Sequence, residues 1–431
     1  MIESLLVANR GEIARRIMRT ARRLGVRTIA VHSEVDAALP FVTEADEAIL
    51  LGPPQCYRDV DAIMAAAKST GARAIHPGYG FLAENAEFAR TVEAAGLVWV
   101  GPGADAIAAM GDKINARDLM AAAGVPVAPG TTDPAEAAAI GFPVMVKAAA
   151  GGGGMGMAVV ADESALTAEY EKVRGFAARM FGDEAVFFER YFPRVRHVEV
   201  QILGLADGRV VALGERECSV QRRNQKLAEE SPSPAVSPEL RERVLAAAVR
   251  AGEAVGYRNA GTVECLLAPD TGEFFFLEMN TRLQVEHPVT ELIFGIDLVE
   301  AQLRVASDLP VEVPTESRGH ALELRVNAED PKRFLPGPGA ITHWVEPTGE
   351  GVRVDAGYGP GTTVTPHYDS LMAKLIVYGA DRAETLARAR DAVAGFEITG
   401  PKNNLPFFAE LLDNPEFVSG DYDTALVGRM R

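Results

Sequence analysis

Residues 143–160 of this 431-residue chain read Pro-Val-Met-Val-Lys-Ala-Ala-Ala-Gly-Gly-Gly-Gly-Met-Gly-Met-Ala-Val-Val. The glycines from Gly151 onward satisfy the GxGxxG pattern of dinucleotide-binding loops, but that pattern must open a helix. Here both flanks, residues 143–147 and 157–160, have the composition of strands. We therefore predict a hairpin whose bare glycine backbone lies over phosphates, with Lys147 pointing at the same anion. The alternative is a flexible turn. A Walker-type loop, in which a glycine-rich run ends in Gly-Lys-Ser/Thr, is absent from the sequence.

The residues before this hairpin have the pattern of a parallel α/β sheet. Residues 5–8 form a short apolar run, Gly11 follows, and apolar side chains then recur at helical spacing from Ile13 to Leu24 before a second run at 28–31. The pattern continues to about residue 110 and predicts an open parallel sheet, which binds ligands at its strand ends.

Beyond residue 192 the period changes to that of an antiparallel sheet. Residues 198–202 alternate at period two, and a further strand follows a turn at 207–208. Ser237 before Pro238 predicts the capped start of a helix that ends at Gly256. The fold class is therefore α/β and α+β.

Two glutamates mark a second hairpin. Residues 261–267 and 273–280 are apolar strands around a turn at 269–272, so Glu264 and Glu278 are expected opposite each other. Facing like charges are unfavourable unless a cation joins them, and oxygen ligands suit Mg²⁺ or Mn²⁺. Asn280, on the same face, supplies another oxygen. The alternative is a register slip that leaves both carboxylates in water.

Polar residues concentrate directly after this predicted metal strand. Residues 280–288 hold an arginine, two amides, a carboxylate and a histidine, which indicates a second small-anion site with Arg282 as its clamp and Glu286 as a general base. Residues 221–226 form another basic loop, and Arg325 lies in an alternating strand. Taken singly, each is more often a surface charge than a ligand.

Charge and cysteine content exclude several classes. Sixty acidic against 43 basic residues give a net charge of −17, so no positive field collects nucleic acid or anionic membrane. The three cysteines contain no CxxC pair, which indicates neither a disulfide framework nor a zinc site. With no secretory signal at the start, we expect a cytoplasmic protein.

Five ungapped motifs stand out along the chain: residues 7–14 (VANRGEIA), 75–82 (IHPGYGFL), 110–113 (MGDK), 196–201 (RHVEVQ) and 278–290 (EMNTRLQVEHPVT). Together they resemble the biotin carboxylase family, the ATP-grasp component of biotin-dependent acyl-CoA carboxylases. The resemblance runs from residue 2 to about 425. It implies an ATP-grasp fold with a Rossmann-like domain at 1–112, a linker helix at 113–127, a glycine-loop lid at 128–192, and the core with the C-terminal domain at 193–431.

The resemblance also implies a ligase that uses ATP and bicarbonate to carboxylate biotin through carboxyphosphate, with two metal ions on the triphosphate. The implied nucleotide-binding residues are Lys113, Lys147, Gly153, Gly154, Glu189, Arg190, Tyr191, Phe192, His197, Gln221, Asn224, Leu266, Glu264 and Glu278. Bicarbonate would be held by Lys226, Arg282, Gln284 and Val285, and metal by Glu264, Glu278 and Asn280. The implied catalytic residues are Arg282, Glu286, Arg325 and Lys226, with Arg325 also binding biotin.

Two positions depart from the family pattern. Met155 stands where the glycine loop usually carries arginine or lysine, and Asn224 where relatives often have histidine. Another ATP-grasp carboxylate–amine ligase, or a non-catalytic nucleotide-binding regulator, remains the alternative function.

The sequence contains no Ala/Val-Met-Lys-Met tetrapeptide to accept biotin. Biotin is therefore expected on a separate biotin carboxyl carrier protein, with a separate carboxyltransferase as user of the product and a homodimer as the family's common assembly. Neither nucleic acid nor membrane is an expected partner. The acyl-CoA finally carboxylated would be chosen by the transferase.

Overall fold

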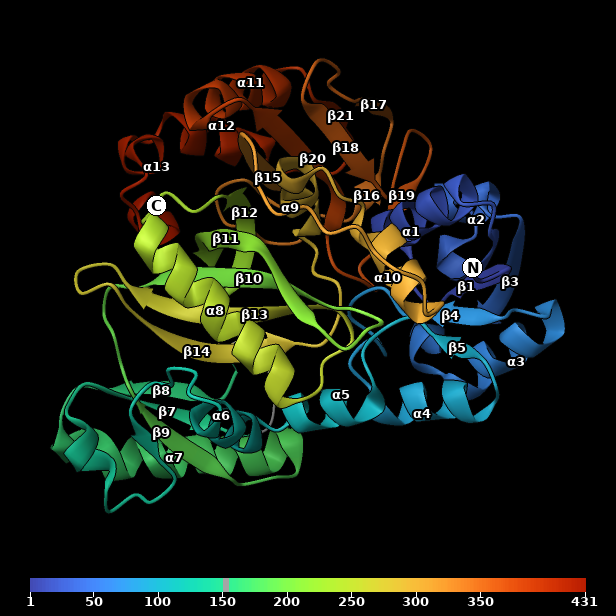
Figure 1. The fold of residues 1–431 in the computed structure, drawn as a ribbon. Coiled ribbons are helices and arrows are strands. Elements are labelled where there is room, and N and C mark those ends of the chain that lie inside the picture. Colours follow the sequence, from blue (N-terminus) through green and yellow to red (C-terminus); the bar gives the residue numbers. More distant parts are fainter. Residues whose placement is uncertain (150–154) are drawn as a thin grey trace.

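The computed structural model describes residues 1–149 and 155–431, and it is built around three main sheets (Figure 1). A parallel sheet holds the N-terminal part, a small antiparallel sheet with one long helix lies at the opposite lower corner of the view, and a large antiparallel sheet runs through the middle. The C-terminal helices cover the far end of this large sheet.

The N-terminal sheet is parallel throughout, with the strand order β3-β2-β1-β4-β5. This confirms the parallel sheet expected for the first 110 residues. Helix α1 begins at Gly11, as the sequence indicated, and its apolar side Ile13, Ile17 and Ala21 is buried against the sheet. The strands are β1 (Ser4–Val7), β2 (Arg27–Ser33), β3 (Glu47–Gly52), β4 (Ala74–His76) and β5 (Val98–Trp99), and the α-helices are α1 (Gly11–Arg23), α2 (Pro40–Glu44), α3 (Val60–Thr70), α4 (Ala86–Ala94), α5 (Ala104–Gly111) and α6 (Lys113–Ala122).

The small sheet has the order β6-β9-β7-β8 and packs on the long helix α7. Its members are β6 (Gly130–Thr131), β7 (Val144–Ala148), β8 (Met157–Val160), β9 (Val186–Arg190) and α7 (Glu163–Phe181). Strands β7 and β8 pair antiparallel with Lys147 opposite Met157, so the two predicted strands of the glycine hairpin are confirmed. The predicted phosphate contacts of Gly153 and Gly154 lie outside the described residues.

The large sheet has the order β14-β13-β10-β11-β12-β15-β20-β18, with antiparallel neighbours. Its strands are β10 (Arg196–Gly204), β11 (Val210–Arg222), β12 (Gln225–Ser231), β13 (Asn259–Ala268), β14 (Glu273–Asn280), β15 (His320–Asn327), β18 (Val352–Ala356) and β20 (Leu371–Gly379). Helix α8 (Pro238–Ala254) packs on it. The Ser237 hydroxyl accepts a hydrogen bond from the Leu240 amide, which confirms the predicted cap.

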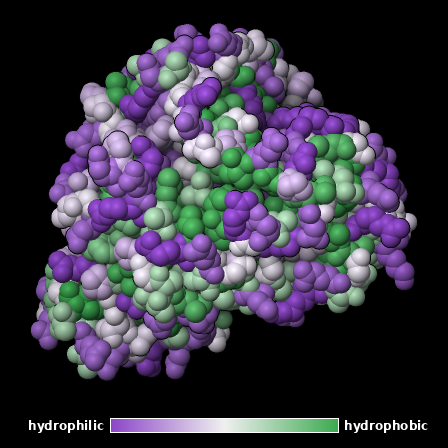
Figure 2. Space-filling view, in the orientation of Figure 1, coloured by the Kyte–Doolittle hydropathy of each residue, from purple (hydrophilic) through white to green (hydrophobic). Residues whose placement is uncertain are grey.

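The remaining elements surround this sheet. They are α9 (His287–Phe294), α10 (Leu298–Ala306), α11 (Arg382–Ala394), α12 (Leu405–Asp413), α13 (Pro415–Ser419), α14 (Leu426–Arg429), and the short strands β16 (Gly339–Ala340), β17 (His343–Val345), β19 (Thr363–Val364) and β21 (Glu397–Thr399). Figure 2 shows apolar side chains gathered across the middle of one face of the molecule, bordered by polar ones. None of the helices described is both long enough and apolar enough to span a membrane.

One sequence prediction needs correction. Residues 221–226, expected as a basic loop, are the end of β11, a two-residue turn and the start of β12. Arg223 and Asn224 both have positive φ, 51° and 65°, as hairpin turns that match the right-handed strand twist require. Gln221 pairs with Lys226 across this hairpin, so the turn fixes the direction in which Lys226 leaves the strand.

Candidate active site

A row of charged residues crosses four neighbouring strands of the large sheet. Glu278 on β14 pairs with Glu264 on β13, Glu264 pairs with Glu199 on β10, and Glu199 pairs with Arg216 on β11. The predicted pairing of Glu264 with Glu278 is therefore confirmed, beside a β-bulge between Glu264 and Cys265, and the alternative that leaves both carboxylates in water is wrong because Glu264 is buried. Three like charges in a row are unfavourable across strands unless cations lie among them, so this row defines the electrostatics of the site.

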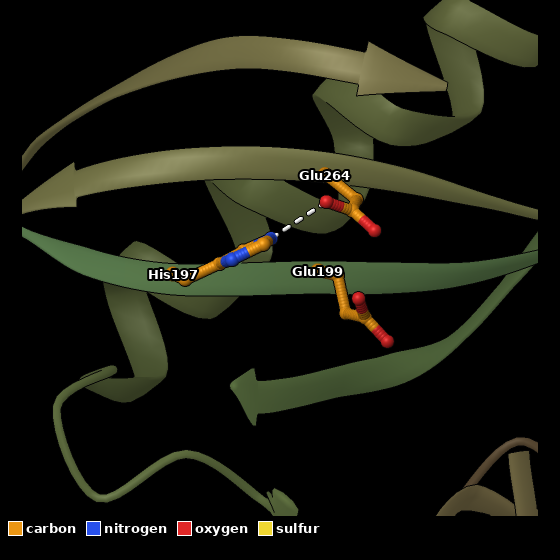
Figure 3. A group of neighbouring side chains, drawn as sticks. All are labelled: His197, Glu199 and Glu264. Atoms are coloured by element: carbon orange, nitrogen blue, oxygen red, sulfur yellow. Dashed lines mark hydrogen bonds and ion pairs between the residues drawn. The ribbon is translucent and has the colours of Figure 1, made fainter. Parts of the chain in front are cut away.

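His197 extends the site along β10. It lies two residues before Glu199 and so shares its side of the strand (Figure 3). Its Nε2 is 2.7 Å from Glu264 Oε2. Burial alone would lower the pKa of His197, but the facing Glu264 carboxylate outweighs it and raises that pKa. His197 thus contacts only the Oε2 atom of Glu264, and the Oε1 atom is left to other partners.

The Lys226 ammonium occupies the point where three carboxylates converge. Nζ lies 2.6 Å from Glu286 Oε1 and 3.0 Å from Glu264 Oε1, and it also donates to Glu199. Burial lowers the pKa of Lys226, but these carboxylates raise it well above its ordinary value. Lys226 is therefore the cation that makes the close approach of these carboxylates tolerable.

The predicted anion clamp is assembled by residues 280–286. Arg282 donates from Nη2 to Asn280 Oδ1 at 2.7 Å and from Nη1 to Gln284 Oε1 at 3.0 Å. Its Nε donates to Glu84 at 3.0 Å, and the Thr281 amide donates to the same carboxylate. Val285 lies beside them, and its carbonyl accepts from Lys374 at 2.8 Å. The structure thus brings together every residue predicted for the small-anion site, and it adds Glu84 from the N-terminal part.

Glu286 is fully buried between two cations. Its Oε1 accepts from Lys226, and its Oε2 accepts from Arg325 Nη2 at 2.9 Å. Burial raises the pKa of Glu286, but Lys226 and Arg325 outweigh it and hold the pKa well below its ordinary value. Before substrate binds, the predicted general base is therefore an ionised carboxylate.

The described members of the predicted nucleotide site lie on or next to strands of both the small sheet and the large sheet, apart from Lys113 on α6. Lys147 on β7 forms an ion pair of 2.5 Å with Glu189 on β9, so these two residues bind each other here. Phe192 stacks on Phe275, with ring centroids 4.8 Å apart. Leu266 pairs with His197 across β13 and β10. Arg190 is exposed, and Tyr191 donates its backbone amide to the Pro143 carbonyl.

Lys113 begins α6 near Glu278. Burial lowers the pKa of Lys113, whereas the charge of Glu278 opposes that change. The pKa of Glu278 is itself raised by burial and by the neighbouring Glu264 and Glu84, while Lys113 counteracts this. Glu278 is thus the carboxylate of the row whose charge is least compensated, and an added cation would relieve it.

The donor set fits a hard cation beside Glu278. Glu264, Glu278 and the Asn280 amide present only oxygen ligands for a metal, which are the ligands Mg²⁺ and Mn²⁺ prefer. Among the described side chains, the two groups with three converging metal-ligating atoms are His197, Glu199 and Glu264, and Glu199, Cys218 and Glu286. Lys226 contacts carboxylates of both groups, and Glu264 also accepts from His197, so Glu278 is the carboxylate of the row at which an added cation would compensate the most charge.

Sequence reasoning missed several residues that complete the site. Glu199 and Arg216 lie in the charged row, Glu229 contacts Arg325, and Glu84 contacts Arg282. For Glu199 a signal existed, because it alternates with His197 in a quoted motif. The other three come from segments whose pairing the local pattern does not give.

The three sheets and the charged row on the large one define an ATP-grasp enzyme. Three family models match successive parts of the chain: "Biotin carboxylase, N-terminal domain" at residues 1–107, "Carbamoyl-phosphate synthase L chain, ATP binding domain" at 112–313, and "Biotin carboxylase C-terminal domain" at 323–429. The biotin carboxylase of Pseudomonas aeruginosa is 48% identical over 435 residues, covering 97% of this chain and 96% of the relative. Biotin carboxylase 1 of Bacillus subtilis is 48% identical over 439 residues, covering 98% of this chain and 98% of the relative.

Solved structures agree with these matches. The Campylobacter jejuni biotin carboxylase in a complex with a β,γ-ATP ligand superposes with a TM-score of 0.97 at 40% identity, covering 100% of this chain and 99% of that one. The biotin carboxylase domain dimer of Hydrogenobacter thermophilus 2-oxoglutarate carboxylase, with MgADP and bicarbonate, has a TM-score of 0.95 at 41% identity, covering 100% and 98%. The chain belongs to the biotin carboxylase family, and its activity is ATP-dependent carboxylation of biotin. The carboxylate–amine ligase and the regulator are therefore not supported.

Proposed function

We propose that the chain carboxylates biotin on a separate carrier protein with ATP and bicarbonate, as the first half-reaction of an acetyl-CoA or other acyl-CoA carboxylase. The observation that carries this is the hydrogen-bonded cluster beside the carboxylate row, in which Lys226 and Arg325 donate to Glu286. Arg282 joins it through Gln284, which shares the acceptor Glu264 with Lys226. Lys226 and Arg282 can bind a small anion, and Glu286 can take its proton. Arg325 adds a second cation that can stabilise an enolate. An ATP-dependent ligase without carboxylation chemistry has no use for the last of these.

Bicarbonate would bind between Arg282, Gln284 and the backbone of Val285, with Lys226 beside it. Glu286 takes its proton, and the freed oxygen attacks the γ-phosphorus of ATP while ADP leaves with the electron pair. The low pKa of Glu286 in the substrate-free site suits this step, because only an ionised carboxylate can take the bicarbonate proton.

Carboxyphosphate would then break down to CO₂ and phosphate within the closed site. The phosphate takes the ureido N–H proton of biotin, and the enolate attacks CO₂ while Arg325 stabilises the charge on the ureido oxygen. The glycine-hairpin unit closes as a lid and excludes the water that would destroy the intermediate. Lys113, Lys147 and His197 belong to the nucleotide side of this site.

Mg²⁺ or Mn²⁺, as two ions, would be held by Glu264, Glu278 and Asn280 and would neutralise the charge of the triphosphate. The predicted adenine pocket, formed by Glu189, Arg190, Tyr191, Phe192 and Leu266, and the predicted domain division after residues 112, 127 and 192 are part of the same proposal.

The function is tested by ADP release from the wild-type chain with Mg²⁺, ATP, bicarbonate and free biotin. We expect release that depends on both bicarbonate and biotin. Release that needs neither, or none above background, would overturn the proposal.

Replacing Glu278 by glutamine is expected to lower turnover about 100-fold at limiting Mg²⁺, because one oxygen ligand loses its charge. The fold should be retained, and the melting temperature without metal should stay equal or rise, since a facing like charge is removed. Turnover is measured over a Mg²⁺ titration, with Glu273→Gln on the exposed start of the same strand as control. Equal Mg²⁺ dependence in both variants would refute the metal assignment.

The exchange Met155→Arg is expected to lower the Michaelis constant for ATP several-fold and to leave that for bicarbonate unchanged. Met155 is 53% exposed beside the predicted phosphate loop, where an arginine can add a charge-assisted bond. Steady-state kinetics at saturating bicarbonate measure this. An unaltered Michaelis constant for ATP in this variant would show that the side chain at position 155 contacts no phosphate.

For assembly we propose a homodimer that works with a biotin carboxyl carrier protein and carboxyltransferase subunits in the cytoplasm. Sedimentation should give a mass near twice the 46.0 kDa of the chain. A mass of one chain at micromolar concentration would contradict the dimer.

A further inference from the structure

Arg325 is held by two buried carboxylates from different elements. Its Nε donates to Glu229 Oε1 on β12 at 2.6 Å, and its Nη2 donates to Glu286 Oε2 at 2.9 Å. Both carboxylate side chains are fully buried, whereas the Arg325 side chain retains 15% exposure. Its third nitrogen, Nη1, makes no hydrogen bond with any residue in the described ranges, so it remains for an acceptor that enters the site.

A second glutamate lies next to Glu229 but makes no such contact. Glu323 on β15 is the register partner of Glu229 on β12 and is equally buried. Within the described part of the chain, neither of its carboxylate oxygens has a hydrogen-bond partner. The charged groups around the two glutamates are Arg325 on β15, Glu286 from the loop before α9, Lys226 on β12 and Lys374 on β20. The two residues thus share an environment and differ in their contact with Arg325.

We propose that Glu229 is a positioning residue for biotin carboxylation, which fixes the Arg325 guanidinium so that Nη1 meets the ureido oxygen of biotin. This rests on the proposed function, in which Arg325 binds biotin. Glu286 cannot serve as the lasting anchor, because it becomes neutral when it takes the bicarbonate proton and then holds Nη2 less strongly. Glu229 takes no part in that proton transfer, so it keeps Arg325 in place while the biotin step follows.

The two glutamates also differ in the cations that oppose the effect of burial on their pKa values. Burial, helped by Glu286 and opposed by Arg325 and Lys226, raises the pKa of Glu229 to about 7. Burial raises the pKa of Glu323 well above its ordinary value, with Lys374 opposing it. Above pH 7 Glu229 is therefore an anionic anchor, and as the pH falls through about 7 it becomes a neutral and weaker one.

The test compares Glu229→Gln with Glu323→Gln, which make the same isosteric change at two paired positions. With free biotin at pH 8, Glu229→Gln should raise the Michaelis constant for biotin roughly tenfold, since one charged hydrogen bond is lost, and leave that for ATP within about twofold. Glu323→Gln should match the wild type in both. In the wild type the Michaelis constant for biotin should also rise below pH 7. In Glu229→Gln this Michaelis constant should not change with pH.

Equal effects of the two variants would overturn the proposal, because a general disturbance of the cluster would then explain them. An unchanged biotin constant in Glu229→Gln would also overturn it. Melting temperatures verify folding, and if Glu229→Gln does not fold, Glu229→Asp, which keeps the charge on a shorter side chain, should raise the biotin constant alone. Absence of biotin-dependent ADP release from the wild type would instead refute the proposed function itself.

Discussion

Lys226→Met is expected to reduce biotin-dependent ADP release by about 1,000-fold or more. The ammonium is the common partner of Glu199, Glu264 and Glu286, and all three carboxylates are buried. Without it, like charges face each other in a medium that screens them poorly, so their pKa values rise and protons replace the lost cation. A protonated Glu286 cannot take the bicarbonate proton, and the anion loses a binding group as well.

The measurement is ADP release with saturating ATP, bicarbonate and biotin, followed from pH 6 to 9. Since the carboxylates ionise again at higher pH, part of the activity should return there. Lys402→Met is the matched control, because Lys402 is 65% exposed and forms a surface ion pair with Asp330. Retention of more than a tenth of wild-type activity by Lys226→Met at pH 7.5 would show that Lys226 is not the organising cation.

The parts of the fold that sequence predicts well are those fixed by neighbours along the chain. The short turn of the β13–β14 hairpin fixes the pairing next to it, from Ala268 with Glu273 to Cys265 with Phe276, and a β-bulge between Cys265 and Glu264 then brings Glu264 opposite Glu278. The Ser237 cap and the helix start at Gly11 are equally local. Each depends on a few consecutive residues whose chemistry allows little else.

Contacts between strands that are distant in sequence were not predictable in this way. The pairing of Glu199 with Glu264 joins residues that are 65 positions apart in the sequence. The pairing of β12 with β15 brings Glu229 next to Arg325, which lies 96 positions later. Alternation shows that these strands have two sides, but it does not say which strand lies next to which. Resemblance to a family supplied residue roles, whereas the partners Glu84, Glu229 and Arg216 required the folded chain.

The basic segment at 221–226 illustrates a different cause. Its composition suggested a loop, yet Arg223 and Asn224 adopt positive φ angles and close a tight hairpin. Asparagine is favoured at positions with positive φ, but arginine is not. Of the two turn residues, only Asn224 therefore indicated a tight hairpin. The consequence is functional, because this hairpin sets the strand position from which Lys226 reaches the carboxylates.

The largest expected effect on stability is that of Arg216→Met. Arg216 has no exposed side-chain surface and donates to Glu199, to Gln201 at 2.8 Å, to Thr290 at 2.9 Å and to Thr262 at 3.0 Å. Methionine fills a similar volume but leaves these acceptors without their donor. Removing one partner of a buried ion pair costs about 3–5 kcal/mol, so the melting temperature should fall by several degrees.

Arg209→Met is the control, since Arg209 is exposed at the turn between β10 and β11 and pairs with the nearby Asp207. Its melting temperature should equal that of the wild type. The double variant Arg216→Met with Glu199→Met separates the two sources of the loss. If the loss comes from the stranded Glu199 charge, the second exchange removes that charge and recovers much of the stability, although activity stays low because Lys226 loses a partner. No recovery would mean that the neutral acceptors Gln201, Thr262 and Thr290 carry the cost, and an unchanged melting temperature in Arg216→Met would contradict the role of this arginine as the cation that ends the charged row.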